Sequence, residues 1–212
     1  MRELFFILLG YLSGSVLYAY RLPLCLRGVD ITEGAADKNP GVFNCFARAG
    51  RTIGVLALVC ELLKGFLPVL GAAQVLDTGR WPFALVMAAP VVGHAFPLFH
   101  RFRGGKAITV SFGVTLGLLP VWEPFALLAA FYLFFSLVVE VKPHRRRSIV
   151  TFLSFAFWSA VLLPRTPAAL GCLLISGVVV SRHVRAPGAE DRLELTLSLI
   201  HISEPTRQAE IS

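Results

Sequence analysis

Long apolar stretches recur along the chain and alternate with short polar segments. A helix needs roughly 20 apolar residues to cross a bilayer, with some scatter. The pattern predicts helices at residues 4–24, 53–76, 81–98, 107–121, 124–141, 149–163 and 167–181. The stretch 107–121 is short, which is typical of a partial or tilted crossing. The expected fold class is therefore an all-α integral membrane protein with about seven transmembrane helices and a partly inserted loop.

Composition agrees with this interpretation. Of the 212 residues, 56% are hydrophobic and 16% are charged, which is too apolar for an ordinary soluble domain. The opening "MRELFFILLGYLSGSVLYAY" has no strongly basic start and no cleavage site, so it predicts a first helix that is retained. The scattered cysteines have no metal-ligand spacing and are interpreted as free thiols: Cys25, Cys45, Cys60 and Cys172.

The C-terminal segment differs from the rest of the chain. "LSLIHISEPTR", which begins at Leu197, resembles the in-frame translation of a sequencing-library transposon adapter. We therefore expect one transmembrane domain over residues 1–196 and a non-native tail over residues 197–212. On this interpretation the natural sequence ends near Thr196, and the true C-terminus is missing.

Positive charge is distributed unevenly along the chain, which has a net charge of +7. Basic clusters follow the first, third, fifth and seventh predicted helices, whereas the opposite ends hold only Arg2, Arg80 and Arg165. The positive-inside rule then predicts an outside N-terminus and cytoplasmic basic loops. Two explanations remain open at this point. The charge serves topology and attraction to anionic lipid heads, or it forms a site for phosphate-bearing substrates.

The first basic loop, residues 28–50, contains a turn signal followed by an apolar segment. "KNPG" combines residues that tolerate left-handed backbone angles with a proline of fixed angle. The following "VFNCFARAG" predicts a short helix that dips into the bundle. The free N–H groups at such a helix start provide a natural seat for phosphate.

The second loop lies in "GHAFPLFHRFRGGKAITVSFG", residues 93–113. Gly104 and Gly105 allow close backbone approach, Lys106 adds a point charge, and a helix is expected to begin at Ala107. Together these features predict an anion cradle, and the alternative is a glycine turn with anchoring charges. His94 is either a satisfied hydrogen-bonding residue or part of that site. The nucleotide pattern GxxxxGK[ST] is absent, so nucleotide binding is not predicted.

The third loop, "KPHRRRSI", covers residues 142–149, where Pro143 is expected to end a helix. His144 and Arg145 are the candidates to reach a phosphate, and the alternative is a basic patch that only sets topology. Glu61 and Lys64 are three residues apart inside a predicted span, so they share one helix face. Charges in such a place usually face the bundle interior. They are either a structural pair or the wall of the site.

These motifs resemble a known family. "GYLSGSVLYAYRL", "KNPGVFNCFARAG", "ELLKGFLPV" and above all "GHAFPLFHRFRGGKAITVSFG" are similar to the bacterial acyl-phosphate:glycerol-3-phosphate acyltransferases, the PlsY family. The likeness runs from the first helix to about Ile149. It implies a multi-pass enzyme of the bacterial inner membrane with its site facing the cytoplasm. Such an enzyme moves a fatty acyl group from acyl phosphate to the 1-hydroxyl of glycerol 3-phosphate, giving lysophosphatidic acid.

The resemblance also implies partners and site residues. The expected partners are the two substrates and membrane lipids, with no nucleic acid, cofactor or metal. The residues with a catalytic role would be Lys106, His144 and Asn44. The substrate-binding residues would be Asn39, Gly41, Arg48, His94, Arg103, Gly104, Gly105, Arg145 and Ser148.

The chain departs from the family pattern in two motifs. Asp37 stands at about the place of a serine, Phe43 replaces a threonine, and the Glu and Asn of the third motif, "HREN", are missing after His144 and Arg145. A carboxylate facing phosphate adds repulsion. The alternative hypothesis is therefore a catalytically impaired accessory protein that binds lipid phosphates. A small-solute transporter is less favoured, because no inverted repeat is evident.

Overall fold

The computed structural model describes residues 1–35, 37–184 and 194–197. Most of this part of the chain is helical, and it also contains one short antiparallel pair of strands. In chain order the elements are α1 (Arg2–Ser15), α2 (Tyr18–Arg27), α3 (Val42–Ala49), α4 (Arg51–Val75), α5 (Pro82–Ala95), a 3₁₀ turn (Leu98–His100), α6 (Ile108–Leu116), α7 (Glu123–Leu133), a π-helical turn (Phe134–Val138), β1 (Val139–Lys142), α8 (His144–Leu162), α9 (Pro167–Val184) and β2 (Glu194–Leu197).

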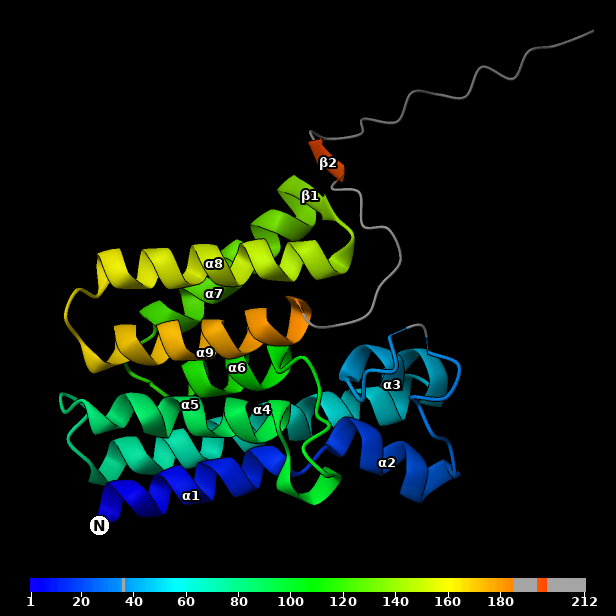
Figure 1. Ribbon diagram of the computed structural model, residues 1–212, viewed down its shortest axis with the longest axis horizontal. Helices are drawn as coiled ribbons and strands as arrows, with labels where there is room; N and C mark the ends of the chain where they lie inside the picture. The colour runs from blue at the N-terminus through cyan, green and yellow to red at the C-terminus, as the bar shows by residue number, and fades with distance from the viewer. Residues whose placement is uncertain (36, 185–193, 198–212) are drawn as a thin grey trace, which may run out of the picture.

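The long helices lie side by side in a stack, with α1 at one edge and α8 near the other (Figure 1). Helix α5 packs between α1 and α9, α8 covers α9, and α4 packs against α6 and α1. Val86, Met87 and Val91 of α5 are fully buried, so the core is centred on this helix. Helices α2 and α3 lie beyond one end of the stack, where α3 contacts α4 (Figure 1).

The outer surface of the stack is apolar. Large hydrophobic side chains are exposed on α1, α4, α5 and α8, including Leu4, Phe5, Leu56, Leu67, Leu85, Phe157 and Leu162. Among the described residues, three helical stretches are long and apolar enough to cross a membrane: Arg51–Val75, Pro82–His100 and Pro167–Val184. The pair α1 and α2 makes a fourth if it is counted as one bent span. These features fit a helical bundle surrounded by hydrocarbon.

The predicted helices over residues 53–76, 81–98 and 167–181 are confirmed as α4, α5 and α9. The short helix expected in "VFNCFARAG" is confirmed as α3. Helix α6 has 9 residues. Its length of roughly 14 Å is about half the hydrocarbon thickness. A count of seven crossings therefore stays a prediction.

The helices predicted over residues 124–141 and 149–163 differ in their extent from those of the structure. The helix expected over residues 124–141 ends as α7 at Leu133 and continues through the π-helical turn into β1. Strand β1 pairs with β2, which is a long-range contact that local periodicity cannot reveal. Pro143 then precedes the first residue of α8, His144, where its missing N–H is harmless. Helix α8 therefore begins before the predicted start at residue 149. The proposed domain boundary after Thr196 falls inside β2, and residues 198–212 lie outside the described part.

The helix expected over residues 4–24 is bent by 43° between α1 and α2. At the bend, the Val16 backbone is extended and the helical hydrogen bonds are interrupted. Side chains of α4 replace the missing partners: Lys64 Nζ donates to the Val16 carbonyl (2.7 Å), and the Ala19 N–H donates to Glu61 Oε1 (3.1 Å). Broken backbone in a membrane protein is tolerated where other groups satisfy it.

Glu61, Lys64 and His94 form a buried cluster between α4 and α5. Lys64 Nζ lies 2.7 Å from Glu61 Oε2, and His94 Nδ1 lies 3.1 Å from the same oxygen. Lys64 Nζ also lies 2.8 Å from His94 Nδ1. The side chains of Glu61 and Lys64 are 0% and 1% exposed, so their charges are compensated almost entirely by each other and by these partners.

We expect Lys64→Met to destabilise the fold strongly, because it leaves the Glu61 carboxylate buried without its cation. Breaking a buried pair in this way costs about 3–5 kcal/mol. A loss of that size corresponds to a fall in Tm on the order of 10 °C for a chain of this length. Thermal unfolding of the detergent-solubilised protein measures the effect. Leu63→Met, on the lipid-facing neighbour, is the control, and an unchanged Tm in Lys64→Met would contradict the assigned role.

Candidate active site

A cavity of about 440 Å³ opens where the first loop, α3, the start of α6, α7 and the start of α8 meet. Glu61 and His94 of the buried cluster form part of its wall. The lining residues are Asp37, Asn39, Gly41, Val42, Phe43, Asn44, Phe46, Glu61, His94, Lys106, Ala107, Ile108, Thr109, Tyr132 and His144. The cavity thus combines one apolar wall with a small set of polar groups, as small-molecule sites generally do.

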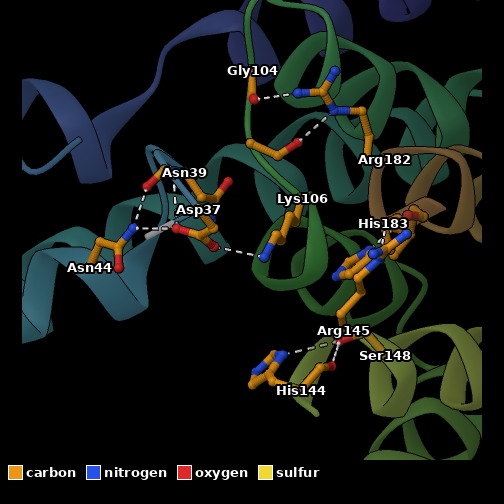
Figure 2. A network of polar contacts seen from close by, with 12 residues as sticks. Asp37, Asn39, Asn44, Gly104, Lys106, His144, Arg145, Ser148, Arg182 and His183 are labelled. Carbon is orange, nitrogen blue, oxygen red and sulfur yellow. Dashed lines mark hydrogen bonds and ion pairs between the residues drawn. The ribbon is translucent and has the colours of Figure 1, made fainter. Parts of the chain in front are cut away.

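The first loop is organised around the Asp37 carboxylate (Figure 2). Its Oδ1 accepts hydrogen bonds from the Asn39 backbone N–H (3.1 Å) and from Asn44 Nδ2 (3.0 Å). Asn44 Nδ2 also donates to the Asn39 carbonyl at 2.8 Å. A Cβ atom at Gly41 would meet the end of the Asn39 side chain, so the small residue leaves room for the Asn39 amide as it stands. This local network fixes the start of α3 beside the cavity.

Lys106 reaches across the cavity to the same carboxylate. Its Nζ lies 2.7 Å from Asp37 Oδ2 (Figure 2), and the two side chains are 20% and 34% exposed. Burial by itself would raise the pKa of Asp37. The hydrogen bonds from Lys106, Asn44 and the Asn39 N–H outweigh it and lower that pKa below its ordinary value. The Asp37 carboxyl group is therefore ionised at neutral pH.

The two glycines before Lys106 are required by packing against α5. A Cβ at Gly104 would collide with the His94 carbonyl, and one at Gly105 would collide with the His94 ring. The Gly105 N–H donates to the His94 carbonyl at 3.2 Å. Arg182 of α9 donates to the Gly104 carbonyl at 2.6 Å, as Figure 2 shows. It also donates to the Gly105 carbonyl at 3.3 Å. The turn therefore presents Lys106, while the Gly105 amide is used within the protein.

His144 lines the cavity from the first turn of α8. Its Nε2 lies 3.4 Å from the Tyr132 hydroxyl, and its Nδ1 lies 3.4 Å from the Ser148 hydroxyl. Partial burial, followed by the positive charges of Arg147 and Lys106, lowers the pKa of His144. The imidazole is thus neutral at pH 7 and is able to accept a proton.

The structure brings half of the predicted site residues together and leaves the others elsewhere. The predicted residues that line the cavity are Asn39, Gly41, Asn44, His94, Lys106 and His144. Arg48 and Arg103 are exposed outside it, and Ser148 is buried beneath His144. Arg145 donates to the His183 and Val184 carbonyls at the end of α9 (2.7 and 2.9 Å). This position of Arg145 is explained by the cluster of carbonyls at a helix end, which attracts cations.

Sequence reasoning did not single out Tyr132 or Arg182, and it treated Asp37 only as a departure from a motif. Tyr132 lies in an apolar stretch, where its hydroxyl was a weak signal. Arg182 belongs to a basic cluster that served only to predict orientation. Within the described part of the chain, no group of three His, Cys, Asp or Glu side chains is placed to hold a metal ion. The donors at the cavity are instead of the kind that bind anions.

The fold and the cavity define a class of protein: a helical membrane bundle with a cavity at one end that is lined by apolar and polar side chains. Comparison with known proteins makes this specific. A family model described as "Glycerol-3-phosphate acyltransferase" matches residues 4–188. The chain belongs to this family, and the PlsY-type resemblance found in the sequence is confirmed.

Relatives and solved structures agree with this assignment. The glycerol-3-phosphate acyltransferase of Pseudomonas aeruginosa (strain LESB58) is 33% identical over 177 residues, which cover 83% of this chain and 89% of that protein. The Geobacter sulfurreducens protein of the same name is 31% identical over 180 residues, 85% of this chain and 89% of that protein. The crystal structure of PlsY (YgiH), an integral membrane glycerol 3-phosphate acyltransferase, matches with a TM-score of 0.71 and 25% identity. The match to its glycerol 3-phosphate form covers 86% of this chain and 88% of that one.

Gly105→Ala tests the packing of the turn against His94. The added methyl would meet the His94 ring. We expect a loss of stability of about 1–3 kcal/mol, as for other overpacked sites. The matched control is Gly177→Ala in α9, where a Cβ would meet nothing within 4 Å and helix propensity favours alanine. Thermal unfolding of both variants in detergent is the measurement. Equal Tm values would show that the turn does not need the close approach.

Proposed function

We propose that the protein transfers a fatty acyl group from acyl phosphate to the 1-hydroxyl of glycerol 3-phosphate, producing lysophosphatidic acid for phospholipid synthesis. The observation that carries this proposal is the cavity itself, which Lys106, Asn39, Asn44 and His144 line beside an apolar wall. Family membership supports the same reaction. The related PlsY structures are described as glycerol 3-phosphate and lysophosphatidic acid forms, which correspond to an acceptor and a product.

The reaction needs positioning and charge stabilisation more than a protein nucleophile. The 1-hydroxyl oxygen attacks the carbonyl carbon of acyl phosphate, a new ester bond forms, and the bond from that carbon to the phosphate oxygen breaks. Phosphate leaves with the electron pair, and the hydroxyl proton passes to a base. Neutral His144 is the group in the cavity suited to that role. Lys106, just before α6, binds the acceptor's phosphate in this proposal, and its charge also offsets the negative charge that develops as the leaving phosphate departs.

The remaining residues take supporting roles in this proposal. Asn44 and Asn39 orient the acceptor, Gly41 keeps the turn open, and His94 holds the wall in place. Gly104 and Gly105 shape the turn that carries Lys106. The Ser148 hydroxyl supports His144 by donating to the backbone carbonyl of His144 at 3.1 Å. Arg48, Arg103 and Arg145 stay predicted phosphate ligands. Each would have to move its side chain toward the cavity to contact substrate.

A second candidate function has one observation in its favour. The pairing of Lys106 with Asp37 at 2.7 Å occupies the cation that the reaction needs. A catalytically impaired protein that binds lipid phosphates would tolerate that pairing. Acceptor-dependent release of phosphate from acyl phosphate distinguishes the two functions.

We further propose the membrane arrangement that the sequence predicts. Counting the bent pair α1–α2 as one crossing, and α4 to α9 as one each, gives seven crossings with the N-terminus outside. The basic loops and the cavity then face the cytoplasm from a bacterial inner membrane. The positive-inside rule supports this orientation, because basic residues cluster in the three loops that border the cavity. Residues 1–196 form a single domain in this proposal, and residues 197–212 are a non-native tail.

Lys106→Ala is expected to lower kcat/KM by about 100-fold or more, because it removes the phosphate-stabilising charge. The assay follows phosphate release from palmitoyl phosphate with and without glycerol 3-phosphate. Lys142→Ala is the matched control, because Lys142 lies in β1 outside the cavity lining. Acceptor-dependent release that survives in Lys106→Ala would remove Lys106 from the mechanism. No release from the folded wild-type protein would favour the second candidate function.

The pH dependence of kcat/KM, which reports ionisations of the free enzyme, tests His144 as the base. The pKa of His144 is lowered from 6.5, so its neutral form persists into more acidic solution than for an ordinary histidine. We therefore expect kcat/KM to fall with decreasing pH only below pH 6.5, as the imidazole takes up a proton. His144→Gln should lower kcat/KM and remove the part of this acidic limb that His144 causes. An acidic limb that persists unchanged in the variant would assign the titration to another group.

A further inference from the structure

Asp37 neutralises the cation on which phosphate binding depends. Among the described residues that line the cavity, Lys106 is the only lysine or arginine. One oxygen of Asp37 lies 2.7 Å from Lys106 Nζ, and the other accepts hydrogen bonds from Asn44 and the Asn39 N–H. Both carboxylate oxygens are therefore held by donors of the protein. The charge is fixed in place rather than free to withdraw into solvent.

A bound phosphate must share Lys106 with this carboxylate. Phosphate and carboxylate oxygens that both bind one ammonium nitrogen lie within about 6 Å of each other. Lysine has three N–H donors, so it can serve both anions at once. Repulsion between them remains, and it grows with each negative charge on the phosphate. In a partly buried cavity this repulsion is screened less than at a free surface.

We propose that Asp37 is a specificity-determining residue. At the position where Lys106 binds the acceptor's phosphate, the Asp37 carboxylate shifts the cavity's preference from doubly charged toward singly charged tetrahedral anions. This inference rests on the proposed function, because it takes Lys106 as the ligand of that phosphate. The number of hydrogen-bond donors is the same for both kinds of anion. The discrimination therefore comes from charge alone. It adds a substrate preference that the uncharged serine of the family motif would not impose.

Two ligands of nearly equal shape and different charge test the proposal. At pH 8 glycerol 3-phosphate is almost entirely a dianion, because its second pKa is about 6. Glycerol 3-sulfate has the same tetrahedral head with a single negative charge. Calorimetric titration of the full chain in detergent gives the Kd of each. The ratio of the sulfate Kd to the phosphate Kd is the readout, because a loss of folded protein affects both values alike.

We expect Asp37→Asn and Asp37→Ser to raise this ratio about tenfold, because both remove the charge that repels the second negative charge. Glu33→Gln removes a carboxylate from the same loop at an exposed position outside the cavity lining, and it should leave the ratio unchanged. A ratio that stays constant in both Asp37 variants would overturn the inference. So would tighter binding of both ligands by one common factor, which would mean that Asp37 only obstructs the site.

Acyl transfer from palmitoyl phosphate, measured on the same preparations, separates this inference from the proposed function. Transfer with an unchanged ratio would leave the enzyme assignment intact and remove the role of Asp37. A shifted ratio without any transfer would keep the role of Asp37 in a protein that only binds phosphates. Failure of wild type and both variants to bind either ligand would overturn the inference, and the transfer assay would then decide the proposed function by itself.

Discussion

The contact between His94 and the Glu61–Lys64 pair joins the interior of the bundle to the turn that carries Lys106. Charges at membrane depth are costly unless they are paired and hydrogen-bonded. Here the pair also satisfies the backbone groups freed at the α1–α2 bend, through Val16 and Ala19. The ring of His94 then packs against Gly105 on its other side. The His94 imidazole thus contacts both the Glu61–Lys64 pair and the turn before Lys106, so the packing of α1, α4 and α5 helps to fix the position of that turn.

The close contact with His94 explains why two glycines precede Lys106. In isolation, two glycines followed by a lysine suggest backbone amides aimed at an anion. In the fold, the pair is the only way for the chain to pass so close to His94, and its carbonyls are held by Arg182. The positive charge at the cavity therefore comes from Lys106 itself, among the described lining residues. The glycines contribute by fixing where that lysine stands.

Much of this arrangement was predictable from the sequence, and the remainder depended on long-range contacts. Sustained apolar runs identified α4, α5 and α9, and the loop motifs placed Asn39, Asn44, Lys106 and His144 in one cavity. The α1–α2 bend was not predictable, because its apolar pattern continues and the compensating groups come from α4. The same holds for β1, whose partner strand lies far along the chain. An arginine in a basic loop also has the same hydropathy whether it binds substrate or a carbonyl.

That last ambiguity bears on how basic membrane loops are interpreted. Lys64, Arg145 and Arg182 each bind backbone carbonyls, at the α1–α2 bend, at the end of α9 and at the glycine turn. Irregular backbone at a membrane boundary requires such donors. These cations therefore stabilise the frame of the cavity, and the number of basic residues exceeds the number that face a ligand. Lys106 is the only lysine or arginine among the described residues that line the cavity. A single carboxylate beside it, such as Asp37, therefore has a large influence on what binds there.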